Sequence, residues 1–290
     1  MYLPVKNIVK EIDLKPNDAF LPLFECIVNS IISLKKSKQL TKEDKKIQIQ
    51  IQRGELPGSL NFDGIKTIDS IMVIDNGEGF NEKNYRSFET AYSDLNKVYG
   101  CKGIGRFTVL AAFHQLTVKS TYKDDGEWWY REFYFEADKE IVPIKKAKST
   151  DLIPKTIVHL SEFYNPNIKD YTAKSVNDIA ESIMQHCLVY YLCNELPRIE
   201  LIDTDSNEVA VVNDLYDRLS KEREKEFEIK NQKFHCYITK QEKINNRKNH
   251  YIYYCANSRI VGNGKSIARV NSLYAYPINE NGKSYFLDVY

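Results

Sequence analysis

Residues 24–32, Phe-Glu-Cys-Ile-Val-Asn-Ser-Ile-Ile, decide how the rest of the chain is interpreted. They lie in an apolar pattern with helical spacing, which predicts a helix over 17–37 with one face in the core. Glu25 and Asn29 are four residues apart, so their side chains share one face of that helix. An acid and an amide are unexpected in so apolar a setting unless they have a task or a partner.

The pair has a definite chemistry. A carboxylate can take a proton from water, and an amide oxygen can ligate Mg²⁺. Glu25 and Asn29 are therefore a candidate general base and a candidate metal ligand. The ordinary alternative, a solvated side of an amphipathic helix, stays open for the pair taken alone.

Outward from this helix, the chain alternates between helical and strand patterns. Asn17 or Asp18 is the expected N-cap, and Pro22 is tolerated in the first turn. Residues 46–52, Lys-Ile-Gln-Ile-Gln-Ile-Gln, alternate strictly and predict a strand. Further strands are expected at 70–74, 114–122, 128–136, 156–160 and in 198–290, and further helices after Gly105 and over about 172–194. Residues 81–99 read as an irregular loop or lid, and 215–226 as a charged helix or a loop.

A second motif, Ile-Asp-Asn-Gly-Glu-Gly-Phe at 74–80, follows an apolar strand directly. Asp75 at the end of that strand can accept a hydrogen bond from a buried amine. Gly77 and Gly79 permit backbone dihedrals and close approach that a Cβ would forbid. A hairpin turn is the simpler alternative for Asp-Asn-Gly on its own.

A third motif, Gly-Cys-Lys-Gly-Ile-Gly-Arg at 100–106, opens a predicted helix. Glycine-rich backbone that runs into a helix N-terminus presents N–H groups to phosphate. Lys102 and Arg106 add positive charge. The spacing differs from that of the P-loop, and an isolated glycine loop is a weak signal.

The three motifs in this order resemble the GHKL superfamily, which includes gyrase B, the 90-kDa heat-shock chaperones, MutL mismatch-repair proteins, MORC-like ATPases and histidine-kinase catalytic domains. The resemblance covers about residues 15–160 through Glu-x3-Asn, Asp-x-Gly-x-Gly and Gly-x2-Gly-x-Gly. A fourth element, residues 155–160, is similar to the family's Gly-Thr-x-Val-x-Leu strand with Lys155 in place of glycine. The resemblance implies an α+β protein with a Bergerat-type sandwich, in which helices cover one face of a mixed, antiparallel-rich sheet.

The resemblance also implies roles for individual residues. Glu25 would activate the attacking water, Asn29 would ligate Mg²⁺, and Asp75 would accept the adenine amino group. Gly79 would shape the base pocket, and Thr156 would support the adenine. The other nucleotide-binding positions implied are Gly77, Gly100, Lys102, Gly103, Ile104, Gly105 and Arg106. The chain departs from many relatives at Ile32, where they carry an acid, and at Lys155, where they carry the glycine that precedes Thr156.

Two domains are expected from this resemblance. Residues 1–168 would form the ATP-binding domain, with an N-terminal arm at 1–15 and a lid at about 81–104. Residues 169–290 would form a smaller, transducer-like α+β domain of the S5-like kind, and an unrelated α+β domain is the alternative. The chain ends inside a strand pattern, so truncation of a longer protein is expected.

The transducer resemblance depends on Asn257-Ser258-Arg259, which is similar to an Asn-x-Arg turn of that domain. Transducer domains usually supply a basic residue that reaches the γ-phosphate. Lys265 and Lys283 are the candidates, although neither lies in a recognisable pattern.

Composition limits the function classes. The 290 residues carry a formal net charge of +1, which gives no argument for a nucleic-acid or membrane grip. The six cysteines include no Cys-x-x-Cys pair, so neither a zinc nor a redox site is indicated. No secretory h-region is recognised and no apolar run is expected to span a membrane, so a cytoplasmic location is expected.

The expected function is Mg-dependent ATP binding with slow hydrolysis. It would drive lid closure and homodimerisation of a clamp that acts on an unidentified client, DNA or protein. The alternative is an ATP-sensing regulatory module with little or no turnover.

Overall fold

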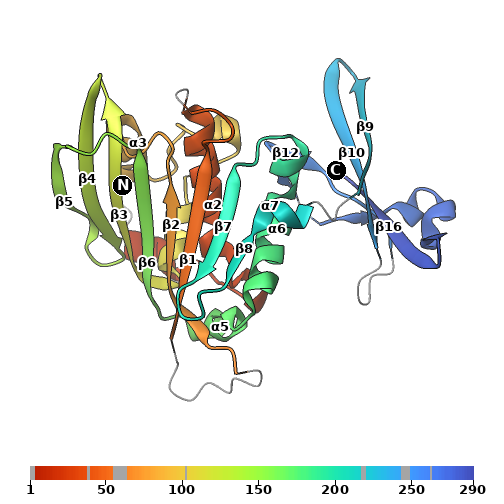
Figure 1. The fold of residues 1–290 in the computed structure, drawn as a ribbon, viewed down its shortest axis with the longest axis horizontal. Coiled ribbons are helices and arrows are strands. Elements are labelled where there is room, and N and C mark those ends of the chain that lie inside the picture. The colour runs from red at the N-terminus through yellow and green to blue at the C-terminus, as the bar shows by residue number, and fades with distance from the viewer. Residues whose placement is uncertain are drawn as a thin grey trace. The chain divides into compact units, whose positions relative to one another are not determined.

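The computed structural model describes residues 4–37, 40–54, 64–101, 103–216, 220–242, 249–261 and 263–290, and these form an α+β protein (Figure 1). The chain divides into two compact units. The first contains residues 1–183 and 197–212, and the second contains 184–196 and 213–290. This division does not coincide with the expected boundary at 168–169, because residues 197–212 return to the first sheet.

The first unit is built on one mixed sheet. Among the described residues, eight strands follow the order β5-β4-β3-β6-β2-β1-β7-β8. They are β1 Lys46–Gly54, β2 Thr67–Asp75, β3 Phe113–Asp124, β4 Glu127–Glu136, β5 Glu140–Lys148, β6 Lys155–Phe163, β7 Arg198–Asp203 and β8 Val209–Val211. Neighbouring strands pair antiparallel except β1 and β7, which are parallel.

The strict alternation in β1 explains how the sheet acquires two different faces. Ile47, Ile49 and Ile51 are at most 1% exposed, whereas Gln48 and Gln50 on the other face are half-buried. Helices α2 (Leu21–Lys36) and α4 (Gly105–Leu110) pack on the apolar face. In the view of Figure 1 the central strands lie in front of α2.

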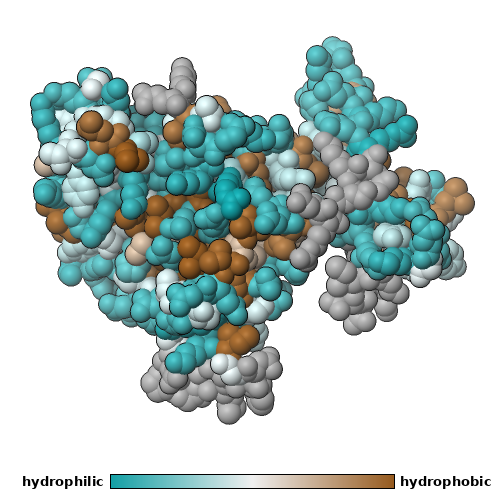
Figure 2. Space-filling model, viewed as in Figure 1, coloured by the Kyte–Doolittle hydropathy of each residue, from teal (hydrophilic) through white to brown (hydrophobic). Residues whose placement is uncertain are grey.

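The opposite face of the sheet is not uniformly polar. Half-buried apolar side chains lie among the glutamines; they are Met72, Ile74, Ile157 and Ile202. Figure 2, which has the same view, shows hydrophobic residues over the central strands amid a hydrophilic surround.

The remaining helical elements of the first unit are short apart from α6. They are α1 Val5–Lys10, η1 Pro16–Asp18, α3 Glu82–Glu89, η2 Lys97–Tyr99, α5 Pro166–Lys169, η3 Asp170–Thr172, and the first part of α6 Val176–Leu192. Residues 81–99 are therefore not an irregular loop throughout. Helix α3 begins there because the Asn81 side chain caps it, accepting from the Asn84 backbone N–H at 2.9 Å.

The first long helix also starts differently from the expectation. Phe20, rather than Asn17 or Asp18, holds the N-cap position of α2, and it makes no side-chain cap hydrogen bond. Asp18 instead accepts from the Lys15 backbone N–H at 3.0 Å, which stabilises the preceding 3₁₀ turn. Pro22 lies in the first turn of α2, as expected.

Helix α2 is part of a segment, Pro16–Lys36, whose length and composition would also suit a membrane span. The protein itself buries 61% of the apolar window in this segment. A buried core helix passes the same test of length and hydropathy, so this feature is weak support for a membrane location.

The second unit contains its own sheet, in the order β14-β11-β16-β10-β9, with β15 paired to β16. The strands are β9 Ser220–Ile229, β10 Gln232–Glu242, β11 Tyr251–Ile252, β14 Lys265–Ser266, β15 Ile278–Glu280 and β16 Lys283–Val289. A separate two-stranded pair consists of β12 Cys255–Ala256 and β13 Arg259–Ile260. Short helical segments complete the unit; they are α7 Val212–Tyr216, η4 Ile267–Arg269 and η5 Ser272–Ala275.

The expectation for 215–226 was wrong over most of its length. Residues from Ser220 form strand β9, which pairs antiparallel with β10. Alternating glutamates and basic residues have a period of two, which suits a strand, and Lys230 and Asn231 form the turn with positive φ. A high content of charged residues does not by itself distinguish a strand from a helix or a loop, whereas the period of two does.

Candidate functional site

Helix α2 brings the three sequence motifs together. The Ser30 hydroxyl donates to Oδ2 of Asp75 at 2.8 Å, and the Glu78 backbone N–H donates to the Ser33 carbonyl at 3.4 Å. At the other end, a Cβ built on Gly105 would lie 2.2 Å from Oε2 of Glu25. The strand-end loop and the glycine loop therefore contact one helix, which also carries Asn29.

Asp75 is a buried carboxylate at the end of β2, only 4% exposed. Its Oδ1 accepts from the Gly77 backbone N–H at 2.9 Å. Burial raises the pKa of Asp75 to about 6, and hydrogen bonds from Gly77, Ser30 and Ser33 oppose that rise. At neutral pH the group is an ionised acceptor in a poorly solvated place.

Two hydroxyl groups lie on β6 and β3, the next two strands of the sheet after the strand that carries Asp75. Thr156 on β6 is the direct antiparallel partner of Asp75, and its Oγ1 is 2.9 Å from Oγ of Ser120 on β3. Ser120 also accepts from the Phe80 backbone N–H at 3.0 Å. Both hydroxyl-bearing residues are buried. Ser120 and Ser30 escaped the sequence analysis; the only local signal was a serine in an apolar pattern.

Gly77 and Gly79 lie where side chains would not fit. A Cβ on Gly77 would be 2.3 Å from Oγ of Ser33 and 2.8 Å from the Ser33 backbone carbonyl carbon. Gly79 has φ +72°, and a Cβ there would be 2.7 Å from Cβ of Tyr122. The loop can therefore press closely on α2 and β3 only because it lacks these side chains.

We expect Gly79→Ala to lower the free energy of unfolding by about 2–4 kcal/mol, because it combines a positive φ with a clash. Gly126→Ala is the matched control: Gly126 has φ +83° with nothing within 4 Å of a built Cβ. The control should lose only about 1 kcal/mol. Urea unfolding of both variants measures the difference, and equal losses would show that the contact with Tyr122 does not constrain the loop.

The glycine loop offers backbone that a ligand can approach closely, but the six-residue helix that follows it has only a weak dipole. Gly100 ends η2 at φ 76°, and a Cβ on Gly103 would lie 2.7 Å from the Ser93 backbone nitrogen. Ile104 is the N-cap of α4, which has only six residues. Lys102 lies outside the described residues.

Arg106 packs against aromatic rings. Its guanidinium carbon lies 5.1 Å from the centre of the Phe88 ring and 4.8 Å from that of Phe107. Burial lowers the pKa of Arg106 to about 10, so it remains charged at neutral pH. A phosphate contact by Arg106 stays a prediction.

Glu25 is half-buried and Asn29 is exposed on α2. Among the residues that the structure describes, no group of three or more His, Cys, Asp or Glu side chains could hold a metal ion. Magnesium seldom needs such a cage, since phosphate oxygens and water commonly complete its six-fold shell. One exposed amide, on the helix that the glycine loop contacts, is therefore compatible with this ion.

The second-unit candidates have local partners. Lys283 forms an ion pair with Glu242 at 2.8 Å, and the Lys265 ammonium lies 5.0 Å from the centre of the Tyr254 ring. Asn257 and Ser258 form the turn between β12 and β13, and the Ser258 hydroxyl donates to Glu195 at 3.1 Å. The side chain of Arg259 lies outside the described residues.

Comparison with known proteins finds no matching family model and no matching curated protein. The assignment of a function therefore rests on the chemistry of the site itself.

Proposed function

We propose that the first unit binds an adenine nucleotide with Mg²⁺ and hydrolyses ATP slowly, in the manner of GHKL ATPases. One observation carries the proposal: of three sequence-distant motifs, each suited to a different part of a nucleotide, one lies on helix α2 and the other two contact that helix. A mixed, largely antiparallel sheet with α2 and α4 on one face supports a Bergerat-type sandwich.

Asp75 would recognise the base. A buried, ionised acceptor favours a ring that presents an exocyclic amine, as adenine does at its sixth position. Guanine has a carbonyl oxygen at that place, and two acceptors facing each other in a poorly solvated site are unfavourable. Thr156 lies beside Asp75 on the neighbouring strand, Ser120 lies next to Thr156 on the strand after it, and both hydroxyl groups can donate or accept.

Asn29 and the glycine loop would serve the phosphates. The amide oxygen of Asn29 would hold Mg²⁺, which supplies charge neutralisation for the triphosphate when bound. The backbone around Gly103 and Gly105 can approach a ligand closely because neither residue has a Cβ. Lys102 and Arg106 are further phosphate partners in this proposal.

Glu25 would accept the proton of the attacking water. It is half-buried, and its carboxylate lies against the backbone of Gly105. Glu25 would thus lie where the glycine loop holds the terminal phosphate. Positioning and charge neutralisation account for most of phosphoryl-transfer catalysis, so this set of residues suffices for slow turnover.

Gly105→Ala should slow phosphate release from bound nucleotide at least tenfold with little change in stability. The new Cβ would displace the flexible end of Glu25, the proposed base, while alanine suits a helix. Single-turnover phosphate release measures the effect, with Thr108→Ala in the same helix as control. Unchanged release in Gly105→Ala would contradict the assigned position of the base.

The proposal extends to clamp action in the cytoplasm. Nucleotide would order the lid at about 81–104 and promote homodimerisation through the arm at 1–15, and closure would act on a macromolecular client. In the structure α1 packs on α4, and Lys6 pairs with Asp138 at 2.6 Å. Light scattering with a non-hydrolysable ATP analogue tests dimerisation. A monomer under every nucleotide condition would refute nucleotide-dependent homodimerisation.

Calorimetric titration with ATP, ADP and GTP in the presence of Mg²⁺ tests the central part of the proposal. We expect both adenine nucleotides to bind and GTP to bind at least tenfold more weakly. Failure of both adenine nucleotides to bind would overturn it. Binding without phosphate release would favour the alternative, an ATP-sensing module.

A further inference from the structure

We propose that Arg131, on β4, is a positioning residue that sets the base-binding loop for nucleotide. The inference rests on the proposed function and adds to it a residue that belongs to none of the three motifs. Arg131 is only 4% exposed, and its guanidinium contacts three consecutive residues that follow the loop, Phe80, Asn81 and Glu82.

The contacts use the shape of the guanidinium group. Nη1 donates to the carbonyls of Phe80 at 3.0 Å and Asn81 at 3.3 Å, while Nη2 donates to Oε2 of Glu82 at 2.6 Å. The guanidinium carbon lies 4.1 Å from the centre of the Tyr85 ring. A lysine ammonium is a point charge and cannot reproduce this fork of donors together with ring stacking.

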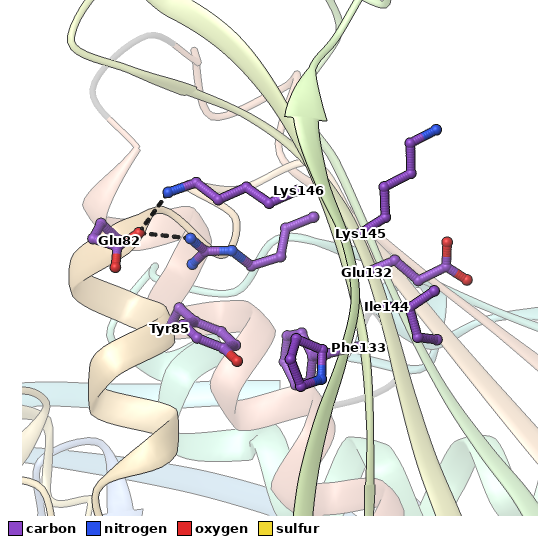
Figure 3. Close-up of a pocket in the computed structure, with 9 residues that line it drawn as sticks. Glu82, Tyr85, Glu132, Phe133, Ile144, Lys145 and Lys146 are labelled. Atoms are coloured by element: carbon purple, nitrogen blue, oxygen red, sulfur yellow. Dashed lines mark hydrogen bonds and ion pairs between the residues drawn. The ribbon is translucent and has the colours of Figure 1, made fainter.

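Glu82 remains ionised over the range in which an assay is practicable. Hydrogen bonds from Lys146 and Arg131 lower the pKa of Glu82 to about 2. Lys146 on β5 donates to the same oxygen at 2.9 Å. Figure 3 shows Glu82 and Tyr85 on α3, with Lys146 reaching Glu82 from the sheet.

Two sets of hydrogen bonds connect the residues that Arg131 contacts to Gly79. Phe80 is held through its carbonyl by Arg131 and through its N–H by Ser120 at 3.0 Å. Asn84, one turn into α3, donates its side-chain amide to the Gly79 carbonyl at 2.7 Å. Displacement of the start of α3 would therefore move Gly79, which the proposed function places against the base.

Aromatic rings pack α3 on β4, where Tyr85 lies 5.1 Å from Phe133, but packing leaves free space beside the start of the helix. A pocket of about 280 Å³ lies beside the contact, lined by residues of α3, β4 and β5 that include Tyr85, Phe133, Ile144 and Lys146 (Figure 3). Side chains do not fill this space, so polar contacts hold the helix start: those of Arg131, the Lys146 ammonium on Glu82, and the Glu82 N–H on Asp124. Loss of the guanidinium would leave α3 room to shift.

Arg53 on β1 provides a matched control, because it is a second buried guanidinium with the same kinds of partner. It donates to Asp203 at 2.5 Å and to the carbonyls of Lys66 at 2.7 Å and Lys174 at 2.9 Å. Arg53 pairs with Ile68, seven residues before Asp75 on β2, which places it roughly 23 Å from the site at about 3.3 Å per residue.

The experiment compares Arg131→Lys with Arg53→Lys. Calorimetry would measure the dissociation constants for ADP and GDP with Mg²⁺, and urea unfolding would measure stability. We expect Arg131→Lys to weaken ADP binding roughly tenfold to hundredfold and to reduce the preference for ADP over GDP. Arg53→Lys should lose comparable stability and keep both dissociation constants within about twofold of wild type.

Glu82→Gln is the second variant, since it removes charge from a half-exposed partner and leaves Arg131 in place. It should weaken ADP binding about threefold and reduce the ADP preference in the same direction. If Arg131→Lys does not unfold cooperatively, the ADP affinity and ADP preference of Glu82→Gln test the role of Arg131 instead. Unchanged ADP affinity and preference in either folded variant, with wild type binding ADP, would overturn the role of Arg131. Absence of ADP binding by wild type would instead refute the proposed function.

Discussion

Asp75→Asn should bind adenine nucleotides about 100-fold more weakly than wild type while remaining at least as stable at pH 8. Hydrogen bonds to charged groups contribute roughly 1.5–3 kcal/mol, and about 1.4 kcal/mol corresponds to a tenfold change in affinity. In the structure both carboxylate oxygens accept, one from Ser30 and one from Gly77. Asparagine can offer an acceptor at only one of these positions, so its NH₂ group would face the Ser30 hydroxyl, which can accept as well as donate.

The stability part of this prediction follows from the pKa of Asp75. The folded-state pKa is about 6 against an ordinary value of 3.8, so the folded protein binds this proton more tightly than the unfolded chain does. The ionised carboxylate is therefore a stability cost at pH 8, and that cost disappears as pH falls from about 6 towards 4. Asparagine removes the buried charge, which offsets the loss of one acceptor.

Nucleotide affinity should show the opposite pH dependence. The amine of adenine binds best to the ionised carboxylate of Asp75, so the nucleotide affinity of the wild type should fall as the pH drops below about 6. Calorimetric titrations from pH 5 to 8 measure this slope. Asp75→Asn has no such group and should show a flatter profile, and parallel profiles would contradict the role of Asp75.

The second large effect is expected for Glu25→Gln. General bases contribute about 10²–10⁴-fold to a rate, so phosphate release should fall by that factor. Glutamine has the shape of glutamate and cannot take a proton, so the dissociation constant for ATP should remain within about threefold of wild type. This combination separates a loss of chemistry from a loss of binding.

Glu181→Gln is the control for this substitution, because Glu181 is an exposed glutamate on helix α6 of the first unit. Its phosphate release should match that of wild type. If Glu25→Gln retained wild-type release, the base would have to be another residue. If both variants and wild type bound ATP without release, the sensing alternative would be favoured.

Local patterns predicted the elements that depend on neighbouring residues. The alternation at 46–52 predicted β1, and the strands expected at 114–122 and 128–136 form β3 and β4, whose turn residues Asp125 and Gly126 have φ 47° and 83°. The segment from Lys283 also forms the expected strand. In each case the deciding interactions lie within a few residues.

The features that escaped prediction depend on contacts between distant segments. Nothing local distinguishes Arg131 from other charged strand residues until β4 is placed beside residues 80–82. Ser120 acquires its place only through the register of β3, β6 and β2. Likewise, the return of β7 to pair with β1 moved the boundary of the first unit far beyond residue 168.

Among the candidate site residues, the sequence identified those whose chemical type is unusual for its setting. Glu25 and Asp75 are acids in apolar surroundings, and Gly79 has the positive φ that a motif glycine suggests. Ser30 and Ser120 could not be identified in this way, because serine is common in strands and helices. Their relevance comes from geometry alone.

A structure of the chain with Mg²⁺ and a non-hydrolysable ATP analogue would test the central claim most directly. We expect the amino group of adenine to lie within hydrogen-bond distance of Asp75, the metal ion on the amide oxygen of Asn29, and the phosphates along the backbone of Gly103–Gly105. A nucleotide bound elsewhere, or no nucleotide at saturating concentration, would contradict it.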